Sequence, residues 1–167
     1  MKNRHYKIMS MFLRFSLEFI FYAGILTMLA LPFIITYRPE FVYRYIWFLP
    51  SRWVNSLNAW FGGNGFTLLF LEVLGLIAVT VIRALVLIFK SVNEDKPFTK
   101  ENALRLRRIA LCCFALFGIF LFKTFYFFTP MSFVATAALL IGSFAALVFS
   151  SLFNLAVEFK SENDLTI

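Results

Sequence analysis

The chain has 167 residues, of which 61% are hydrophobic, 20% aromatic and only 15% charged. A soluble domain is about half apolar and about a quarter charged, so this composition excludes a soluble enzyme, a disordered tail and a disulfide scaffold. Sixteen Lys and Arg against nine Asp and Glu give a formal charge of +7. Beside membrane spans such an excess fixes orientation, so we expect the chain to contact the lipid bilayer and not to bind nucleic acid directly.

Four stretches with few or no charges are each long enough to cross about 30 Å of hydrocarbon at about 1.5 Å per helical residue. They predict an all-α, polytopic membrane protein with four transmembrane helices in a bundle. We expect a single domain over residues 1–167, with spans at about 17–36, 66–89, 109–128 and 133–157.

The first span contains an uncharged run from Phe19 to Thr36. Arg14 and Glu18 stand one helical turn apart at its start, a spacing that lets them pair. A cleaved signal peptide would be shorter and would end at a small-x-small site, which this run lacks. We therefore expect the segment to be retained as a span.

An outer loop over residues 37–65 follows, and it is rich in amphipathic rings. They are Phe41, Tyr43, Tyr45, Trp47, Trp53 and Trp60. Such rings favour headgroup depth, which predicts an aromatic interfacial loop with one or two short helices on the bilayer surface. A ligand or partner surface facing outward is the alternative.

The second loop, residues 90–108, separates the second and third spans. Pro97 breaks any continuous helix there, and Thr99 is suited to cap a new helix that starts near Lys100. Glu101 in the first turn suits the helix dipole. A polar tail over residues 158–167 follows the fourth span.

The basic residues are distributed unevenly between the two sides. The amino end, the 90–108 loop and Lys160 together hold eleven, whereas the outer loop holds Arg38, Arg44 and Arg52. The positive-inside rule then places both termini and the 90–108 loop in the cytoplasm. We expect a multi-pass protein of the cell (cytoplasmic) membrane.

Catalytic constellations are scarce. His5 is the only histidine, so triads and cysteine–histidine pairs have no base, and the adjacent Cys112 and Cys113 cannot supply tetrahedral metal spacing. The sequence has no phosphate-binding glycine motif. We expect no catalytic, cofactor-binding or metal residues, no cofactor and no enzymatic activity.

Two charges lie inside the predicted spans at matching depth. Glu72 comes shortly after the outer start of the second span and Lys123 shortly before the outer end of the third. Because opposite charges offset the cost of burial in hydrocarbon, we predict an intramembrane ion pair between them. It would serve as a proton, ion or ligand site, or as a structural pair that fixes helix register.

Small side chains recur every fourth residue in the fourth span. They are Ala138, Gly142, Ala146 and Ser150. Such a stripe lets helix backbones approach closely. We expect it to mediate helix packing within the bundle, with a second copy of the chain, in a homo-oligomer, as the alternative partner.

The middle loop and the tail carry the segments Pro97-Phe98-Thr99-Lys100-Glu101-Asn102 and Glu162-Asn163-Asp164-Leu165-Thr166-Ile167. With Leu104, Leu106, Arg107 and Ile109, they resemble the bacterial family called domain of unknown function 2975, which consists of small four-span inner-membrane proteins. Members are often encoded beside a small helix-turn-helix regulator, so the resemblance implies that the membrane protein holds or restrains a transcription factor.

This resemblance suggests a cytoplasmic docking site or an intramolecular clasp. Its residues would be Pro97, Phe98, Thr99, Asn102, Asn163, Asp164, Leu165 and Ile167. In the clasp, Asp164 would cap or pair with Arg105 or Arg107. The function expected first is a non-enzymatic membrane-bound modulator or anchor of the regulator. A small transporter or conduit that uses Glu72 and Lys123, and a structural subunit of a membrane complex, are the alternatives.

Overall fold

The computed structural model describes residues 2–38, 40, 51–60, 63–126 and 130–164, and the elements in this part of the chain are α-helices. Their bounds are α1 Lys2–Tyr37, α3 Ser51–Trp60, α4 Gly65–Asn93, α5 Lys100–Tyr126 and α6 Pro130–Asp164.

Four of these helices are long and apolar enough to cross a membrane. The candidate spans are Ile8–Tyr37, Gly65–Asn93, Lys100–Phe125 and Ser132–Glu162. Large apolar side chains such as Phe12, Phe19 and Phe33 are between 68% and 76% exposed. Water would penalise that exposure heavily, whereas hydrocarbon does not. The predicted all-α membrane fold with four spans is confirmed.

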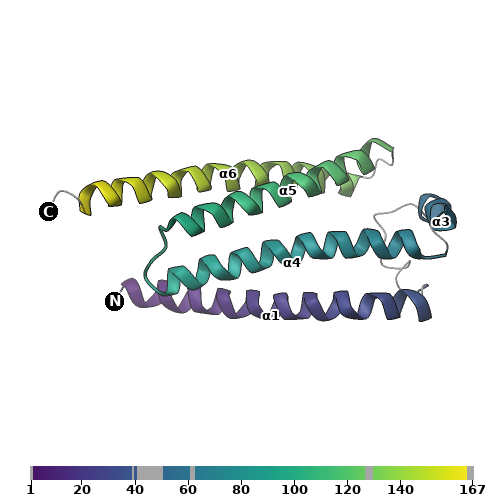
Figure 1. The fold of residues 1–167 in the computed structure, drawn as a ribbon, viewed down its shortest axis with the longest axis horizontal. Helices are drawn as coiled ribbons and strands as arrows, with labels where there is room; N and C mark the ends of the chain where they lie inside the picture. Colours follow the sequence, from purple (N-terminus) through teal and green to yellow (C-terminus); the bar gives the residue numbers. More distant parts are fainter. Residues whose placement is uncertain (1, 39, 41–50, 61–62, 127–129, 165–167) are drawn as a thin grey trace.

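The spans lie side by side and antiparallel in the order α1, α4, α5, α6 (Figure 1). The most extensive contact is between α5 and α6, followed by that between α1 and α4, and α4 joins the two pairs through α5. Two glycines bring α1 and α4 together. A Cβ at Gly24 would lie 3.2 Å from Val79 Cγ2, and one at Gly75 would lie 3.1 Å from Met28 Cγ.

The core is small and lies between α4, α5 and α6. Its buried members are Ala84, Ile88, Ile109, Ala110 and Ala146. Small side chains in this set allow the helices to approach closely where lipid provides no hydrophobic drive for association.

Hydrogen bonds at both ends fix the connection between α4 and α5. Asp95, with φ of 58°, follows the C-cap residue of α4, and the N–H groups of Asp95 and Lys96 donate to the carbonyls of Val92 and Ser91. This is the hydrogen-bond pattern of a Schellman motif. At the other end Thr99 Oγ1 accepts from the N–H of Asn102 at 3.2 Å, so Thr99 caps α5 as predicted.

At the opposite end of the molecule, α3 lies across the ends of the spans and is viewed nearly along its axis in Figure 1. It is held by Asn58, which exchanges hydrogen bonds with Thr67 at the start of α4: Asn58 Nδ2 donates to Thr67 Oγ1 at 2.8 Å, and the Thr67 N–H donates to Asn58 Oδ1 at 3.0 Å. The short helix in the outer loop is therefore observed. Phe41, Tyr43, Tyr45 and Trp47 lie outside the described residues.

Candidate docking site at the basic end

One end of the molecule gathers the segments that the sequence marked as basic. There α1 begins, α4 is connected to α5, and α6 ends (Figure 1). We call it the basic end, because these segments carry eleven Lys and Arg residues. The helix α6 continues through Asp164, so most of the predicted polar tail is an extension of the fourth span.

Asn102 is the centre of a polar network at this end. Its side chain is fully buried in the first turn of α5. Asn102 Nδ2 donates to the Pro97 carbonyl at 2.7 Å, and Asn102 Oδ1 accepts from Arg105 Nη1 at 2.6 Å. Ser91 Oγ, from the last turns of α4, lies 3.4 Å from the same oxygen. These contacts join the connection, α4 and α5 into one unit.

Arg105 extends this network back to α4. Its Nη1 donates to Ser91 Oγ at 3.3 Å and to the Leu87 carbonyl at 3.4 Å. The Leu87 carbonyl also accepts from Ser91 Oγ at 3.2 Å, so these bonds join the first turns of α5 to the last turns of α4. From the sequence, Arg105 was expected to pair with Asp164, and the network with Asn102 was not predicted. Its spacing of three residues from Asn102 was the available signal, because side chains at i and i+3 are neighbours on a helix.

Phe98 and Ser150 attach α6 to this unit. The ring of Phe98 packs on that of Phe153, with centroids 5.1 Å apart, yet Phe98 remains 50% exposed. One turn earlier in α6, the buried Ser150 Oγ donates to the Ala103 carbonyl at 2.8 Å. The basic end therefore presents the half-exposed ring of Phe98 beside the start of α5, which hydrogen bonds join to both α4 and α6.

A groove lies beside this unit, between the start of α5 and the end of α6. Its volume is about 510 Å³, and its lining residues are Lys100, Leu104, Asn154, Val157, Glu158 and Ser161. Leu104 is 55% exposed. A surface that combines an exposed apolar side chain with charges of both signs suits a protein partner. These residues were not predicted as a site, because they come from two segments that are distant in the sequence.

The structure divides the predicted docking residues into two groups. Pro97, Phe98, Thr99 and Asn102 come together before and at the start of α5, where hydrogen bonds among Pro97, Thr99 and Asn102 hold the loop. Asn163 and Asp164 belong to the last turn of α6. Their side chains, and Leu165 and Ile167 entirely, lie outside the described residues, as does the proposed contact of Asp164 with Arg105 or Arg107.

Glu72 and Lys123 are not brought together as an ion pair in the part of the chain that the structure describes. The ion pair observed there joins Arg14 Nε to Glu18 Oε1 at 3.0 Å, as their spacing predicts. Lys123 is buried in the last turn of α5, a helix that packs mainly on α6, whereas Glu72 is half-buried in α4. Two charges at the same depth in a membrane can still lie on helix faces that point in different directions.

The stripe of small residues on α6 is only partly at a helix interface. Ala146 and Ser150 are buried, but Ala138 and Gly142 are exposed, and a Cβ at Gly142 would meet nothing within 4 Å. The expectation that all four pack within the bundle therefore needs correction. The buried face of α6 also includes Thr136 and Ser143.

A family comparison covers most of this architecture. The model of the family described as "Protein of unknown function (DUF2975)" matches residues 37–167, which include the ordered connection, the groove and the helices α3 to α6. The chain belongs to the DUF2975 family. The match begins at Tyr37, so the DUF2975 signature follows the first span. No curated protein and no solved structure matches the chain.

Proposed function

We propose that this DUF2975 protein is a non-enzymatic docking protein of the cytoplasmic membrane, and that its basic end binds a small cytoplasmic helix-turn-helix regulator. The observation that carries the proposal is the groove of about 510 Å³ between α5 and α6, beside the loop that Asn102 fixes. The resemblance noted in the sequence suggests this class of partner.

Orientation is part of the same proposal. The positive-inside rule favours a cytoplasmic basic end, because eleven basic residues lie on its segments and three lie in the outer loop. A cytoplasmic regulator could then reach the groove. The start of α1 and the end of α6 both lie at this end, which agrees with two termini in one compartment (Figure 1).

Preorganisation supports docking at this place. The groove is formed by helices that hydrogen bonds already hold together, such as the one from Ser150 to the Ala103 carbonyl. A partner would therefore lose little affinity to the ordering of the site. Leu104 provides an apolar contact, and Lys100 and Glu158 provide charges of both signs for orientation.

The direct test is photo-crosslinking in the native host. A photoreactive amino acid at Ser161, inside the groove, should form an adduct with a DNA-binding protein, whereas the same probe at Phe33, near the opposite end and 68% exposed, should not. The captured protein should then bind the purified chain in detergent. Absence of an adduct at Ser161 under several growth conditions, or the same adduct from both positions, would contradict the proposal.

A matched pair of variants locates the contact. Leu104→Ala removes an apolar side chain that lines the groove, and Leu155→Ala removes one of similar exposure, 49% against 55%, that does not line it. We expect Leu104→Ala to weaken partner binding about tenfold, because it removes an interfacial apolar contact, and Leu155→Ala to have little effect. Equal effects would place the contact elsewhere.

A further inference from the structure

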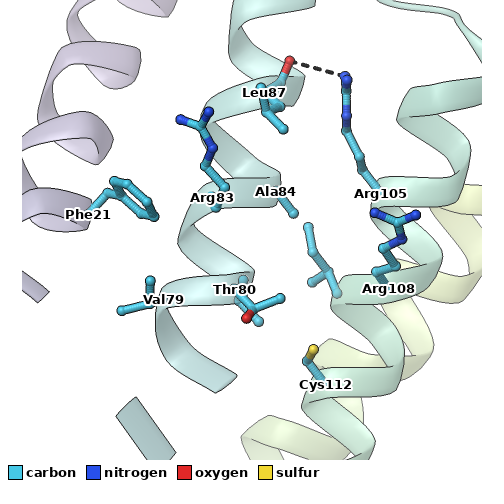
Figure 2. A pocket seen from close by; sticks show the side chains of 11 residues that line it. Phe21, Val79, Thr80, Arg83, Ala84, Leu87, Arg105, Arg108 and Cys112 are labelled. Carbon is cyan, nitrogen blue, oxygen red and sulfur yellow. Dashed lines mark hydrogen bonds between the residues drawn. The ribbon is translucent and has the colours of Figure 1, made fainter. Parts of the chain in front are cut away.

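A second cavity lies between α1, α4 and α5 towards the basic end, with a volume of about 380 Å³ (Figure 2). Three arginines line it: Arg83 from α4, and Arg105 and Arg108 from α5. None of the eleven described residues that line this cleft is acidic. The cleft is therefore strongly cationic, although it is set among apolar helices.

The structure shows these cations without a compensating carboxylate. The guanidinium carbon of Arg83 lies 5.3 Å from the ring centroid of Phe21, and this contact does not neutralise the positive charge. Arg105 donates hydrogen bonds to neutral oxygens, those of Asn102, Ser91 and Leu87. Within the described ranges, no ion pair involves any of the three arginines. Cations beside hydrocarbon are costly unless an anion accompanies them.

The lining of the cleft also changes along the helix axes, from apolar to cationic. Val79 and Cys112 line the part nearer the middle of the spans, whereas the guanidinium of Arg83 points along α4 towards Leu87, at the basic end (Figure 2). An anion at the arginines would thus have an apolar wall directly beneath it. A free phosphate has no group to place against such a wall, but a phospholipid has its acyl chains.

We propose that this cleft binds one anionic phospholipid. The guanidinium groups of Arg83 and Arg108, which lie on opposite sides of the cleft in Figure 2, turn towards its phosphate to form charge-assisted hydrogen bonds. Arg105 adds positive charge to the cleft, and the start of an acyl chain lies along Val79 and Cys112. The volume is near the lower end of small-molecule sites, roughly 300–1,000 Å³, so it suits a headgroup with the first carbons of a chain.

This lipid site is separate from the proposed docking of a regulator. It uses the α1–α4–α5 cleft, whereas the docking groove lies between α5 and α6. Either proposal can fail without the other.

The first experiment compares lipids on the purified full chain by native mass spectrometry. Phosphatidylglycerol should be retained at concentrations at which phosphatidylcholine with the same acyl chains is lost. Phosphatidylcholine retained equally well would overturn the proposal. Inorganic phosphate that displaces phosphatidylglycerol at equal concentration would assign the site to a free anion instead, and would also overturn it.

Variants test the arginines. The double variant Arg83→Gln/Arg108→Gln should weaken phosphatidylglycerol retention by about tenfold or more, because it removes two charge-assisted contacts. The matched control Arg107→Gln/Lys96→Gln removes two exposed cations of the same end that do not line the cleft, and should change retention by less than about twofold. An equal loss in both would show a diffuse charge effect and refute a built site.

A third measurement does not depend on the folding of any variant. Phosphatidylglycerol with a diazirine near the carbonyl end of its acyl chain is crosslinked to the unaltered protein, and the adducts are mapped by peptide mass spectrometry. We expect them to concentrate on residues 79–84 and 109–112. Adducts spread evenly over the exposed apolar faces would overturn the assignment.

Discussion

The burial of Asn102 leads to a quantitative prediction about the α4–α5 connection. Asn102→Ala removes a donor to the Pro97 carbonyl at 2.7 Å and an acceptor for Arg105 at 2.6 Å, at a position with no exposed surface. A neutral hydrogen bond contributes about 1 kcal/mol and one to a charged group about 1.5–3 kcal/mol. Alanine recovers about 0.5 kcal/mol through its helix propensity. We therefore expect a loss of about 2–3.5 kcal/mol in the free energy of unfolding.

The assay is reversible unfolding of the purified chain in mixed micelles, with sodium dodecyl sulfate as the denaturant and far-ultraviolet circular dichroism as the signal. Asn154→Ala is the matched control, because Asn154 is an exposed residue of α6. Its effect should stay within about 0.5 kcal/mol. A value for Asn102→Ala within that range of the control would refute the argument that the network stabilises the connection.

A second substitution separates the two bonds. Asn102→Asp keeps an acceptor for Arg105 but cannot donate to the Pro97 carbonyl, which would face a carboxylate oxygen. We expect a smaller destabilisation than that of Asn102→Ala, because the bond to Arg105 remains as an ion pair. A loss equal to that of Asn102→Ala would mean that the bond to Arg105 contributes nothing.

Three other predictions use the same assay or a topology reporter. Ala146→Leu should cost about 1–3 kcal/mol through overpacking of a buried position, whereas Gly142→Leu, which faces open space, should be tolerated; equal effects would contradict the observed faces of α6. Thr67→Val should cost about 1–3 kcal/mol, because it leaves the buried Asn58 amide without its hydroxyl acceptor; an unchanged midpoint would contradict this. A reporter fused after residue 167 should be cytoplasmic and one inserted at residue 55 external, and any other combination would reverse or break the proposed threading.

The features that sequence predicted well are those set by neighbours in the chain. Pro97 and Thr99 define the end of one helix and the cap of the next through contacts within a few residues, and both act in the structure as expected. The length of each apolar run likewise determines the number of spans. These inferences need no knowledge of which helix packs on which.

The prediction that the small-residue stripe of α6 packs in the bundle was partly wrong for a geometric reason. A residue advances about 100° around an α-helix, so a spacing of four rotates by about 40° at each step. From Ala138 to Ser150 the stripe therefore turns by about 120°, from an exposed face to a buried one. The buried hydroxyls of Thr136, Ser143 and Ser150 recur every seventh residue, which drifts by only about 20° per step. A seven-residue spacing was the better indicator of the packed face.

The two candidate sites depend on how the helices pair, which patterns along the chain do not show. The groove combines Leu104 with Val157, and the cleft combines Arg83 with Arg108, so each requires the pairing of helices and their rotation. The prediction for Glu72 and Lys123 had the depth of both charges but lacked that rotation.

Arg105 links the two proposed sites physically. Its guanidinium lines the cationic cleft and also bonds to Asn102, which fixes the loop beside the docking groove. A phosphate that draws Arg105 into the cleft would weaken its bond to Asn102, whereas one bound by Arg83 and Arg108 alone would leave the bond unchanged. Only the first case gives the lipid different affinities for two states of the loop, which coupling requires. Because coupling of binding energies is reciprocal, an occupied groove would then change the affinity for phosphatidylglycerol by the same factor as the lipid changes the affinity for the partner.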